Sequence, residues 1–336
     1  MDLARRGPGG TGYACGMLLA AIPSPSVSGF HIGPLFIHFY ALMYIVGIAL
    51  AVAIGRRRWK AAGGDPLLVD DMALWGVPFG ILGGRLYFDA TTPADIPHKW
   101  YGWLAVWDGG LGIWGGVLLA TVVCVLVLRR KGVSVLTMMD ALAPCLLVAQ
   151  AVGRIGNYFN QELFGKPTSL PWGLRIDADH RPPGFTDHAL FQPTFLYELL
   201  WDLALAALLI WLGRRGKVRS GGLFALYVAG YSAFRIIEES MRIDYSQHFL
   251  GLRLNFYIAA GCTLAGLVWF AVLQRRAPSP AAAVPAPAAE PVGSEASEAP
   301  EGRREAACAD ADIDDAEGAA APAEADGAEE PATQGR

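Results

Sequence analysis

The residues best suited to chemistry gather in one short stretch, GRIGNYFNQELFG, at residues 153 to 165. Arg154 supplies a guanidinium group, and the amides and carboxylate of NYFNQE follow it directly after a long apolar run. A guanidinium is always charged, and its planar fork can pair with two oxygens of one phosphate group. Amides can bond ester carbonyls, glycerol hydroxyls or peptide carbonyls. The stretch therefore predicts a site for a phosphate-bearing ligand.

Two further arginines lie at the edges of apolar runs, Arg85 in FGILGGRLYF and Arg235 in YSAFRIIEES. A charged side chain at the centre of a membrane span costs about 2.5 to 3.5 kcal/mol unless it meets a partner or a cavity. Each arginine taken alone can instead extend to the membrane interface. Small residues beside all three, in GILGG, DGGLGIWGG and GRIGN, let helix backbones approach closely. Together the three arginines favour a shared polar cavity.

Other polar side chains have two interpretations each. Glu162 and Glu198 can pair with the arginines or, when buried, accept protons; Glu198 can also be an ordinary interfacial carboxylate. His38 and Tyr40, in IHFYALMYIVG, can donate hydrogen bonds into the cavity. Tyrosines in this zone, Tyr44 above all, are more often anchors of the aromatic belt. The spacing does not decide between these roles.

Apolar runs long enough to cross a membrane must position these residues, because a span needs about 17 to 25 residues. The chain of 336 residues is 53% apolar, with a mean hydropathy of +0.34. The runs are continuous and lack the alternation of membrane barrel strands, so they predict helices. The predicted fold class is an all-α integral membrane protein with seven transmembrane helices. The spans are expected at residues 35–54, 69–88, 109–128, 134–152, 194–212, 221–239 and 255–273.

Short basic segments decide the expected orientation. They follow the first, third, fifth and seventh spans and so share one side, which the positive-inside rule makes cytoplasmic. The N-terminus and the loop 153–193 are then expected outside, and the C-terminus in the cytoplasm. This orientation places the predicted site near the outer leaflet.

The two ends of the chain are expected to flank a membrane domain at residues 22–275. Residues 1–21 form an N-terminal extension in which Met17 is an alternative start. Residues 290–336 hold 14 acidic residues and three arginines. Because residues 276–336 are rich in Ala, Pro and Glu and contain no aromatic residue, they predict a disordered acidic tail.

Several classes of protein are disfavoured. The five cysteines show no paired spacing, so neither a disulfide framework nor a metal site is expected, and no cofactor motif is present. A transporter would show inverted repeats or ionisable groups near mid-membrane. No repeat is present, and Asp140 is the main ionisable exception. A non-catalytic scaffold would need the spans, but not Arg154 and Arg235 together.

GRIGNYFNQELFG resembles the signature of the phosphatidylglycerol–prolipoprotein diacylglyceryl transferase family. HFYALMYIVG, FGILGGRLYF, VWDGGLGIWGG, FQPTFLYELLWD and GYSAFRIIEESMR extend the resemblance, in order, over residues 22 to 275. The resemblance implies a multi-pass enzyme of the bacterial plasma membrane. It implies transfer of a diacylglyceryl group from phosphatidylglycerol to the lipobox cysteine of a prolipoprotein, with release of glycerol phosphate. Its partners would be lipid and prolipoprotein, and no nucleic acid is expected.

The resemblance also implies roles for particular residues. Arg154 and Arg235 would bind the phosphate, and Asn157 and Asn160 would shape the site. The wider set of implied functional positions comprises Tyr40, Arg154, Asn157, Asn160, Glu162, Gly165 and Arg235, with Glu198 and Glu239 as family carboxylates. Arg85 and His38 are further binding candidates from the residue patterns alone. Since the nucleophile is the substrate's cysteine, the enzyme needs none of its own.

The chain departs from the family pattern where a base would be expected. Trp114 and Gln192 stand where many members have histidine, which leaves His38, Glu162 and Glu198 as candidates for the proton acceptor. Our hypothesis is that electrostatics rather than a dedicated imidazole generates the thiolate, because cationic surroundings lower the pKa of a thiol.

This hypothesis predicts that His38→Gln keeps its transfer rate to within about a hundredfold, the lower bound for removing a general base. The measurement is a pH–rate profile of folded wild type and variant. A larger loss without loss of folded protein would contradict the hypothesis.

Overall fold

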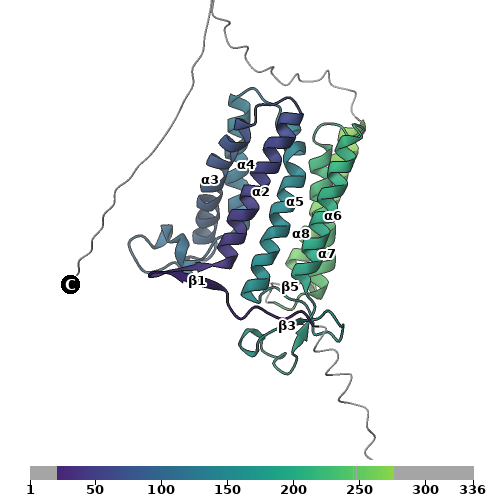
Figure 1. Ribbon diagram of the computed structural model, residues 1–336. Coiled ribbons are helices and arrows are strands. Elements are labelled where there is room, and N and C mark those ends of the chain that lie inside the picture. The colour runs from purple at the N-terminus through teal and green to yellow at the C-terminus, as the bar shows by residue number, and fades with distance from the viewer. Residues whose placement is uncertain (1–20, 245, 247, 276–336) are drawn as a thin grey trace, which may run out of the picture. The chain divides into compact units, whose positions relative to one another are not determined.

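The computed structural model describes residues 21–244, 246 and 248–275, and these contain seven α-helices. All lie in the first of two compact units, residues 1–289. The expectations for residues 1–20 and for the acidic tail from residue 276 lie outside the described residues. The helices, shown in Figure 1, are α2 (Phe39–Ala61), α3 (Leu67–Thr91), α4 (Ile113–Arg130), α5 (Val135–Asn160), α6 (Thr194–Arg214), α7 (Gly222–Met241) and α8 (Leu254–Arg275).

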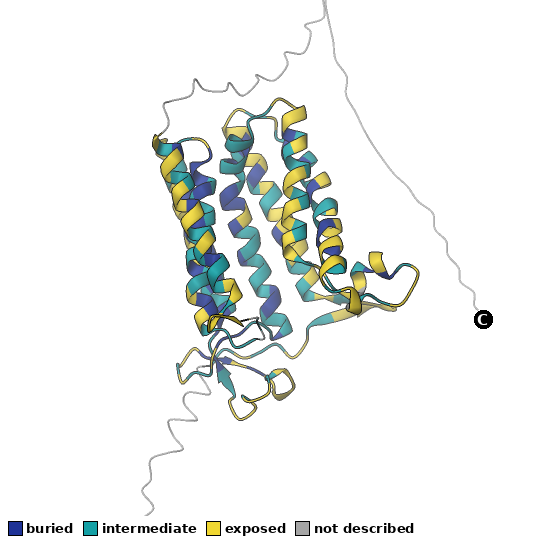
Figure 2. Ribbon diagram, turned by 180° about the vertical axis from the view of Figure 1, so that it is seen from behind, coloured by how far each residue is buried: buried dark blue, intermediate teal, exposed yellow. Residues whose placement is uncertain are grey.

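Six of these helices are long and apolar enough to cross a membrane. α7 matches them in length, at 20 residues, but carries Arg235, Glu238 and Glu239. Exposed residues run along the helices, as Figure 2 shows. Many of them are large and apolar; Leu74 and Leu118, for example, are 66% and 67% exposed. Such faces suit lipid rather than water. The chain is a multi-pass membrane protein. Among the described residues, length and composition support six of the seven predicted spans, and α7 is the one that they do not support.

α5 lies at the centre of the arrangement, packed against α2, α6 and α7, while α3 packs on α4 and α7 on α8. Glycines allow the closest crossings, as the sequence motifs predict. A Cβ atom at Gly83 of α3 would lie 2.3 Å from the carbonyl oxygen of Gly115 in α4. A Cβ at Gly266 of α8 would lie 2.9 Å from the carbonyl oxygen of Ala225 in α7. Any larger residue would push these helix pairs apart.

Four predicted span boundaries are wrong. Residues 35–38 form a strand rather than helix, the first helix continues past residue 54 to Ala61, and the third helix begins at Ile113 rather than at residue 109. α5 continues past residue 152 to Asn160 and ends where Gln161 adopts a left-handed φ of 51°. Hydropathy marks the part of a helix that suits lipid, whereas backbone hydrogen bonding carries the helix on through polar residues. GRIGNYFN is therefore the final part of α5.

Short antiparallel strand pairs, which the sequence analysis did not predict, lie at the helix ends nearest the loop after α5. They are β1 (Gly29–Ile32) with β2 (Leu35–His38), β3 (Leu174–Arg175) with β4 (Leu190–Phe191), and β5 (His248–Phe249) with β6 (Leu252–Arg253). Short 3-10 turns occupy Pro93–Asp95, Gly102–Leu104, Val106–Asp108 and Ala178–His180.

The loop between α5 and α6 folds on a small core of its own, made of Phe164, Leu174, Ile176 and Phe191. Gln161 attaches this loop to the end of α5. Its amide nitrogen donates to an Asp177 carboxylate oxygen at 2.7 Å, and its amide oxygen accepts from the Asp177 backbone N–H at 2.9 Å. These paired bonds fix the chain immediately after the GRIGNYFN segment.

Asp140, the exception that a transporter hypothesis would use, caps a helix. Its carboxylate accepts hydrogen bonds from the backbone N–H groups of Gly221, at 2.6 Å, and Phe224, at 2.9 Å, at the start of α7. A carboxylate there satisfies unpaired N–H groups and complements the positive end of the helix dipole. Asp140 thus links α5 to the helix that carries Arg235.

Replacing Asp140 with Ala should lower the free energy of unfolding by about 1 to 2 kcal/mol, the usual cost of losing such a cap. Thermal unfolding in detergent measures the effect. Asp71→Ala is the matched control, because the Asp71 side chain is 41% exposed and its ion pair lies on the surface. Equal melting temperatures for the two variants would contradict the capping role.

Candidate active site

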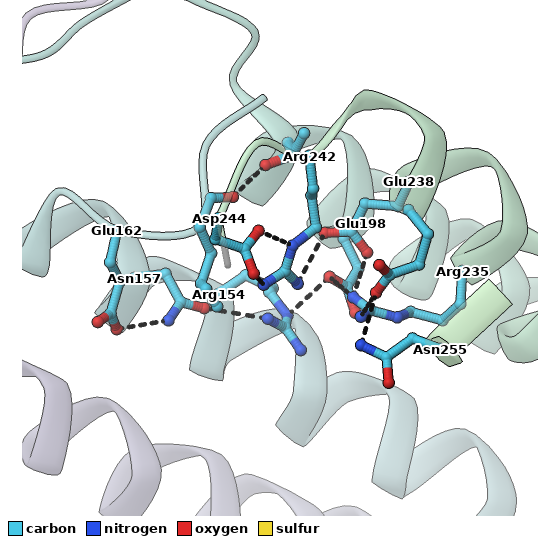
Figure 3. A network of polar contacts seen from close by, with 12 residues as sticks. Arg154, Asn157, Glu162, Glu198, Arg235, Glu238, Arg242, Asp244 and Asn255 are labelled. Atoms are coloured by element: carbon cyan, nitrogen blue, oxygen red, sulfur yellow. Dashed lines mark hydrogen bonds and ion pairs between the residues drawn. The ribbon is translucent and has the colours of Figure 1, made fainter. Parts of the chain in front are cut away.

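A network of arginines and carboxylates joins the end of α5 to α6, α7 and the segment that leads into α8, as Figure 3 shows. Four guanidinium groups meet five carboxylates in it. Its charged members are Arg154, Glu162, Glu198, Arg235, Glu238, Glu239, Arg242, Asp244 and Arg253. The protein thus offsets the charge of its arginines with carboxylates of its own.

Arg154 lies between two partners. Its Nε is 3.0 Å from Glu198 Oε2 on α6, and its Nη1 donates to Asn157 Oδ1 at 3.1 Å. Arg154 and Asn157 are three residues apart on α5, so helical geometry places them on the same face. The predicted pair from GRIGN is therefore brought together, and it faces a carboxylate from another helix.

Glu162 is held by the two asparagines that precede it. The amide nitrogens of Asn157 and Asn160 donate to its Oε1 at 2.8 and 3.2 Å. The left-handed turn at Gln161 reverses the chain after the helix and makes this contact possible. The spacing of the motif thus produces a hydrogen-bonded chain from Arg154 through Asn157 to Glu162.

Arg235 meets three glutamates. Its Nη1 lies 3.4 Å from Glu198 Oε2 and makes a close ion pair with Glu238, while its Nη2 donates to Glu239 Oε1 at 2.8 Å. Glu238 and Glu239 follow Arg235 by three and four residues, which is the spacing for neighbours on a helix surface. Arg154 and Arg235 therefore converge on one oxygen of Glu198.

Burial differs sharply between the two kinds of charge. The side chains of Glu198, Glu238 and Glu239 are 0%, 1% and 1% exposed, whereas those of Arg154 and Arg235 are 20% and 18% exposed. The carboxylates hold the guanidinium groups from the protein interior. About a fifth of each arginine side chain stays exposed.

A second part of the network, which the sequence analysis missed, braces Glu239 from outside α7. Arg253 Nε lies 2.7 Å from Glu239 Oε2, and both Arg253 and Arg242 pair with Asp244, at 3.1 and 2.7 Å. Burial tends to raise the pKa of Asp244, but its bonds to the two guanidiniums hold that pKa below the usual value. Asp244 therefore stays ionised, and its pairing stabilises the fold, until the pH falls through that lowered pKa.

The sequence patterns that could have predicted these missed residues differ in strength. Helical spacing from Arg235 predicts Glu238 and Glu239 as partners, although only Glu239 was singled out. Arg242, Asp244 and Arg253 lie in a segment expected to be a plain outer loop. Their pairing depends on β5 and β6, which bring Arg253 back toward α7. No local pattern in the sequence predicts that return.

The remaining candidates lie around the network or apart from it. Tyr40 donates or accepts a hydrogen bond with Tyr44 at 2.9 Å and packs on Gly156 of α5. The backbone N–H of Gly165 donates to the backbone carbonyl of Gln192 at 2.9 Å, and Gly165 forms an antiparallel β-bridge with Arg242. A Cβ atom at Gly165 would lie 2.8 Å from Cβ of Gln192. His38 is exposed, and its ring contacts Phe36 edge-on at 4.6 Å. Gly165 thus closes the loop against the end of α7.

Arg85 does not join the other two arginines. Its side chain is 2% exposed, lies 3.1 Å from Asp89, and donates to carbonyl oxygens of the loop before α4, including those of Gly102 and Gly109 at 2.6 Å each. These acceptors account for its charge within the protein. The structure gives Arg85 a role in shaping that loop, in place of the shared cavity expected from the sequence.

The structure also places Trp114 and Gln192, which stand where the resemblance leads one to expect histidine. Gln192 accepts from the Tyr197 hydroxyl at 2.7 Å and donates to Thr168 at 3.2 Å, so it ties the loop to α6. Trp114, in the first turn of α4, is 51% exposed. Neither side chain can act as a base.

Fold and site together define a multi-pass membrane protein in which two arginines pair with one buried carboxylate near one end of the helices. Comparison with known proteins is specific: residues 28–272 match the family model described as prolipoprotein diacylglyceryl transferase. The chain belongs to this family. It is 47% identical over 277 residues to the phosphatidylglycerol–prolipoprotein diacylglyceryl transferase of Cutibacterium acnes, covering 81% of this chain and 94% of that protein.

Two further relatives agree. Enzyme 2 of that name from Streptomyces coelicolor is 45% identical, covering 78% of this chain and 84% of its own. The enzyme of that name from Bifidobacterium adolescentis is 44% identical, covering 77% of this chain and 82% of its own. The similarity therefore spans the helical part of the chain.

The placement of Arg85 predicts a structural rather than a ligand-binding phenotype. Arg85→Met should lower the free energy of unfolding by about 3 to 5 kcal/mol, because it leaves Asp89 and several carbonyls without their buried partner. Thermal unfolding in detergent checks this, with Arg56→Met as the control, since the Arg56 side chain is 49% exposed. A melting temperature for Arg85→Met equal to that of Arg56→Met would contradict the role.

Proposed function

We propose that this protein transfers the diacylglyceryl group of phosphatidylglycerol to the lipobox cysteine thiol of prolipoproteins, the first step of lipoprotein maturation. Family membership and the names of the relatives support the reaction. The observation that carries it in this chain is the convergence of Arg154 and Arg235 on Glu198, with part of each arginine side chain left exposed.

The chemistry fits those parts. The cysteine sulfur attacks C3 of the glycerol, a thioether forms, and the C–O bond to phosphate breaks with its electron pair on the phosphate oxygen. The leaving phosphate gains a negative charge, which two preorganised guanidinium groups stabilise where water is excluded. The enzyme supplies charge and position, because the nucleophile belongs to the substrate.

The proposed membrane topology has seven spans, which are the six apolar helices together with α7, the sixth in chain order. Its charged residues do not oppose this, because Arg235, Glu238 and Glu239 meet partners from α6 and α8. The basic ends of α2, α4, α6 and α8 would be cytoplasmic. The site would then face the outer leaflet, the N-terminus would be outside, and the tail from residue 276 would be cytoplasmic.

The direct experiment uses purified full-length protein in phosphatidylglycerol vesicles of labelled acyl chains. Label should pass to a lipobox peptide, and a Cys→Ser peptide should stay unlabelled because its hydroxyl is a much weaker nucleophile. A labelled serine peptide, or no label on the cysteine peptide, would refute the proposed reaction.

Replacing Arg154 or Arg235 with Lys should reduce kcat/KM by roughly tenfold to a thousandfold, because a point charge remains while the planar two-oxygen fork is lost. Arg130→Lys, at the exposed end of α4, is the matched control and should transfer label like wild type. Transfer at the wild-type rate by both Arg154→Lys and Arg235→Lys would remove these arginines from the mechanism and favour a non-catalytic binding protein.

A further inference from the structure

The proposed reaction needs a destination for the thiol proton, and the histidines do not supply one in this structure. Among the described residues, no ion pair or hydrogen bond joins a histidine to the arginine–carboxylate network, and His38 packs against Phe36 instead. Trp114 and Gln192 cannot accept a proton at neutral pH. The acceptor must therefore be sought among the carboxylates beside the arginines.

Two of these carboxylates meet at one arginine. Glu198 Oε2 from α6 and Glu238 Oε2 from α7 both pair with Nη1 of Arg235, which brings the two carboxyl groups close together. Their side chains are 0% and 1% exposed, so water cannot screen them. A proton on one of two such carboxyl groups removes the repulsion between them.

Like charges this close repel each other strongly in a buried site, and pairs of catalytic carboxylates relieve that repulsion by sharing a proton. The arginines keep the second carboxyl ionised. The titratable and charged groups that face the pair are Arg154 from α5, Asp202 from α6, and Tyr231, Arg235, Glu239 and Arg242 from α7 and its C-terminal end. One shared proton would leave the pair with a single negative charge.

We propose that Glu198 and Glu238 act as a single dyad that receives the proton of the substrate thiol. This inference rests on the proposed function. The Tyr231 hydroxyl, which donates to Glu198 Oε1 at 3.1 Å, provides a route between the buried dyad and the bound thiol. The dyad thus serves as the proton acceptor in place of a histidine.

The step balances in charge and in bonds. The sulfur–carbon bond forms, the carbon–oxygen bond to phosphate breaks, and the thiol proton moves to the dyad. The dyad passes from one negative charge to none, while the phosphate passes from one negative charge to two. Arg154 and Arg235 offset the negative charge of the dyad before the reaction. As the dyad takes up the proton, the two arginines stabilise the charge that develops on the leaving phosphate instead. The proton later leaves to water.

A dyad differs from a single base in its response to substitution. Glu198→Gln and Glu238→Gln each leave one ionised carboxyl that can still accept a proton, so each should lower kcat by no more than about tenfold. The double variant has no acceptor and should lose at least about a hundredfold, more than the product of the single effects.

The decisive comparison uses a selenocysteine lipobox peptide beside the cysteine peptide. A selenol is already ionised at neutral pH, so it needs no base. The ratio of selenocysteine to cysteine transfer should rise at least about tenfold from wild type to the double variant. Because both rates come from one preparation, the ratio does not depend on how much of the variant folds.

An unchanged ratio in the double variant would overturn the dyad as the proton acceptor, as would a single variant as inactive as the double one. Wild-type protein that modifies neither peptide would refute the proposed function itself, which is a different result. Glu239→Gln is the matched control, since Glu239 also pairs with Arg235 but lies outside the dyad. Its selenocysteine-to-cysteine ratio should equal that of wild type.

Discussion

The double ion pair of Arg154 and Arg235 with Glu198 is the interaction on which the rest of the structure depends. It joins α5, α6 and α7 at one end of the molecule, where each helix contributes one charged group. Charged side chains in a membrane protein are costly unless they are paired or face a cavity. Here the carboxylates are enclosed and the guanidiniums are partly open, so the cost is met within the protein while an anion can still approach.

Other features maintain that geometry. Asp140 sets the start of α7, the Gln161 turn directs Glu162 back onto Asn157, and Gly165 lets the following loop close against α7. Each acts at a helix end, where backbone groups need partners and the direction of the chain is decided. The residues of GRIGNYFNQELFG thus divide between holding the site and attaching the outer loop.

Sequence patterns predicted much of this arrangement. The apolar runs gave the positions of the helices, and the glycine motifs indicated close helix packing, which occurs where α3 meets α4. Residue type with spacing selected Arg154, Asn157, Glu162 and Arg235. Patterns failed where the outcome depends on tertiary contact. Arg85 has the same local setting as Arg154 but meets loop carbonyls, and Arg253 returns to Glu239 through a hairpin that no periodicity indicates.

The central claim is that both guanidiniums hold the phosphate of one lipid. Solid-state NMR of phosphatidylglycerol bound to the protein, with arginine nitrogens labelled, measures the dipolar coupling between ³¹P and each guanidinium. Lysine replacements assign the signals of Arg154 and Arg235. We predict strong coupling of the one phosphorus to both side chains. Coupling to neither, or to only one of them, would contradict the claim.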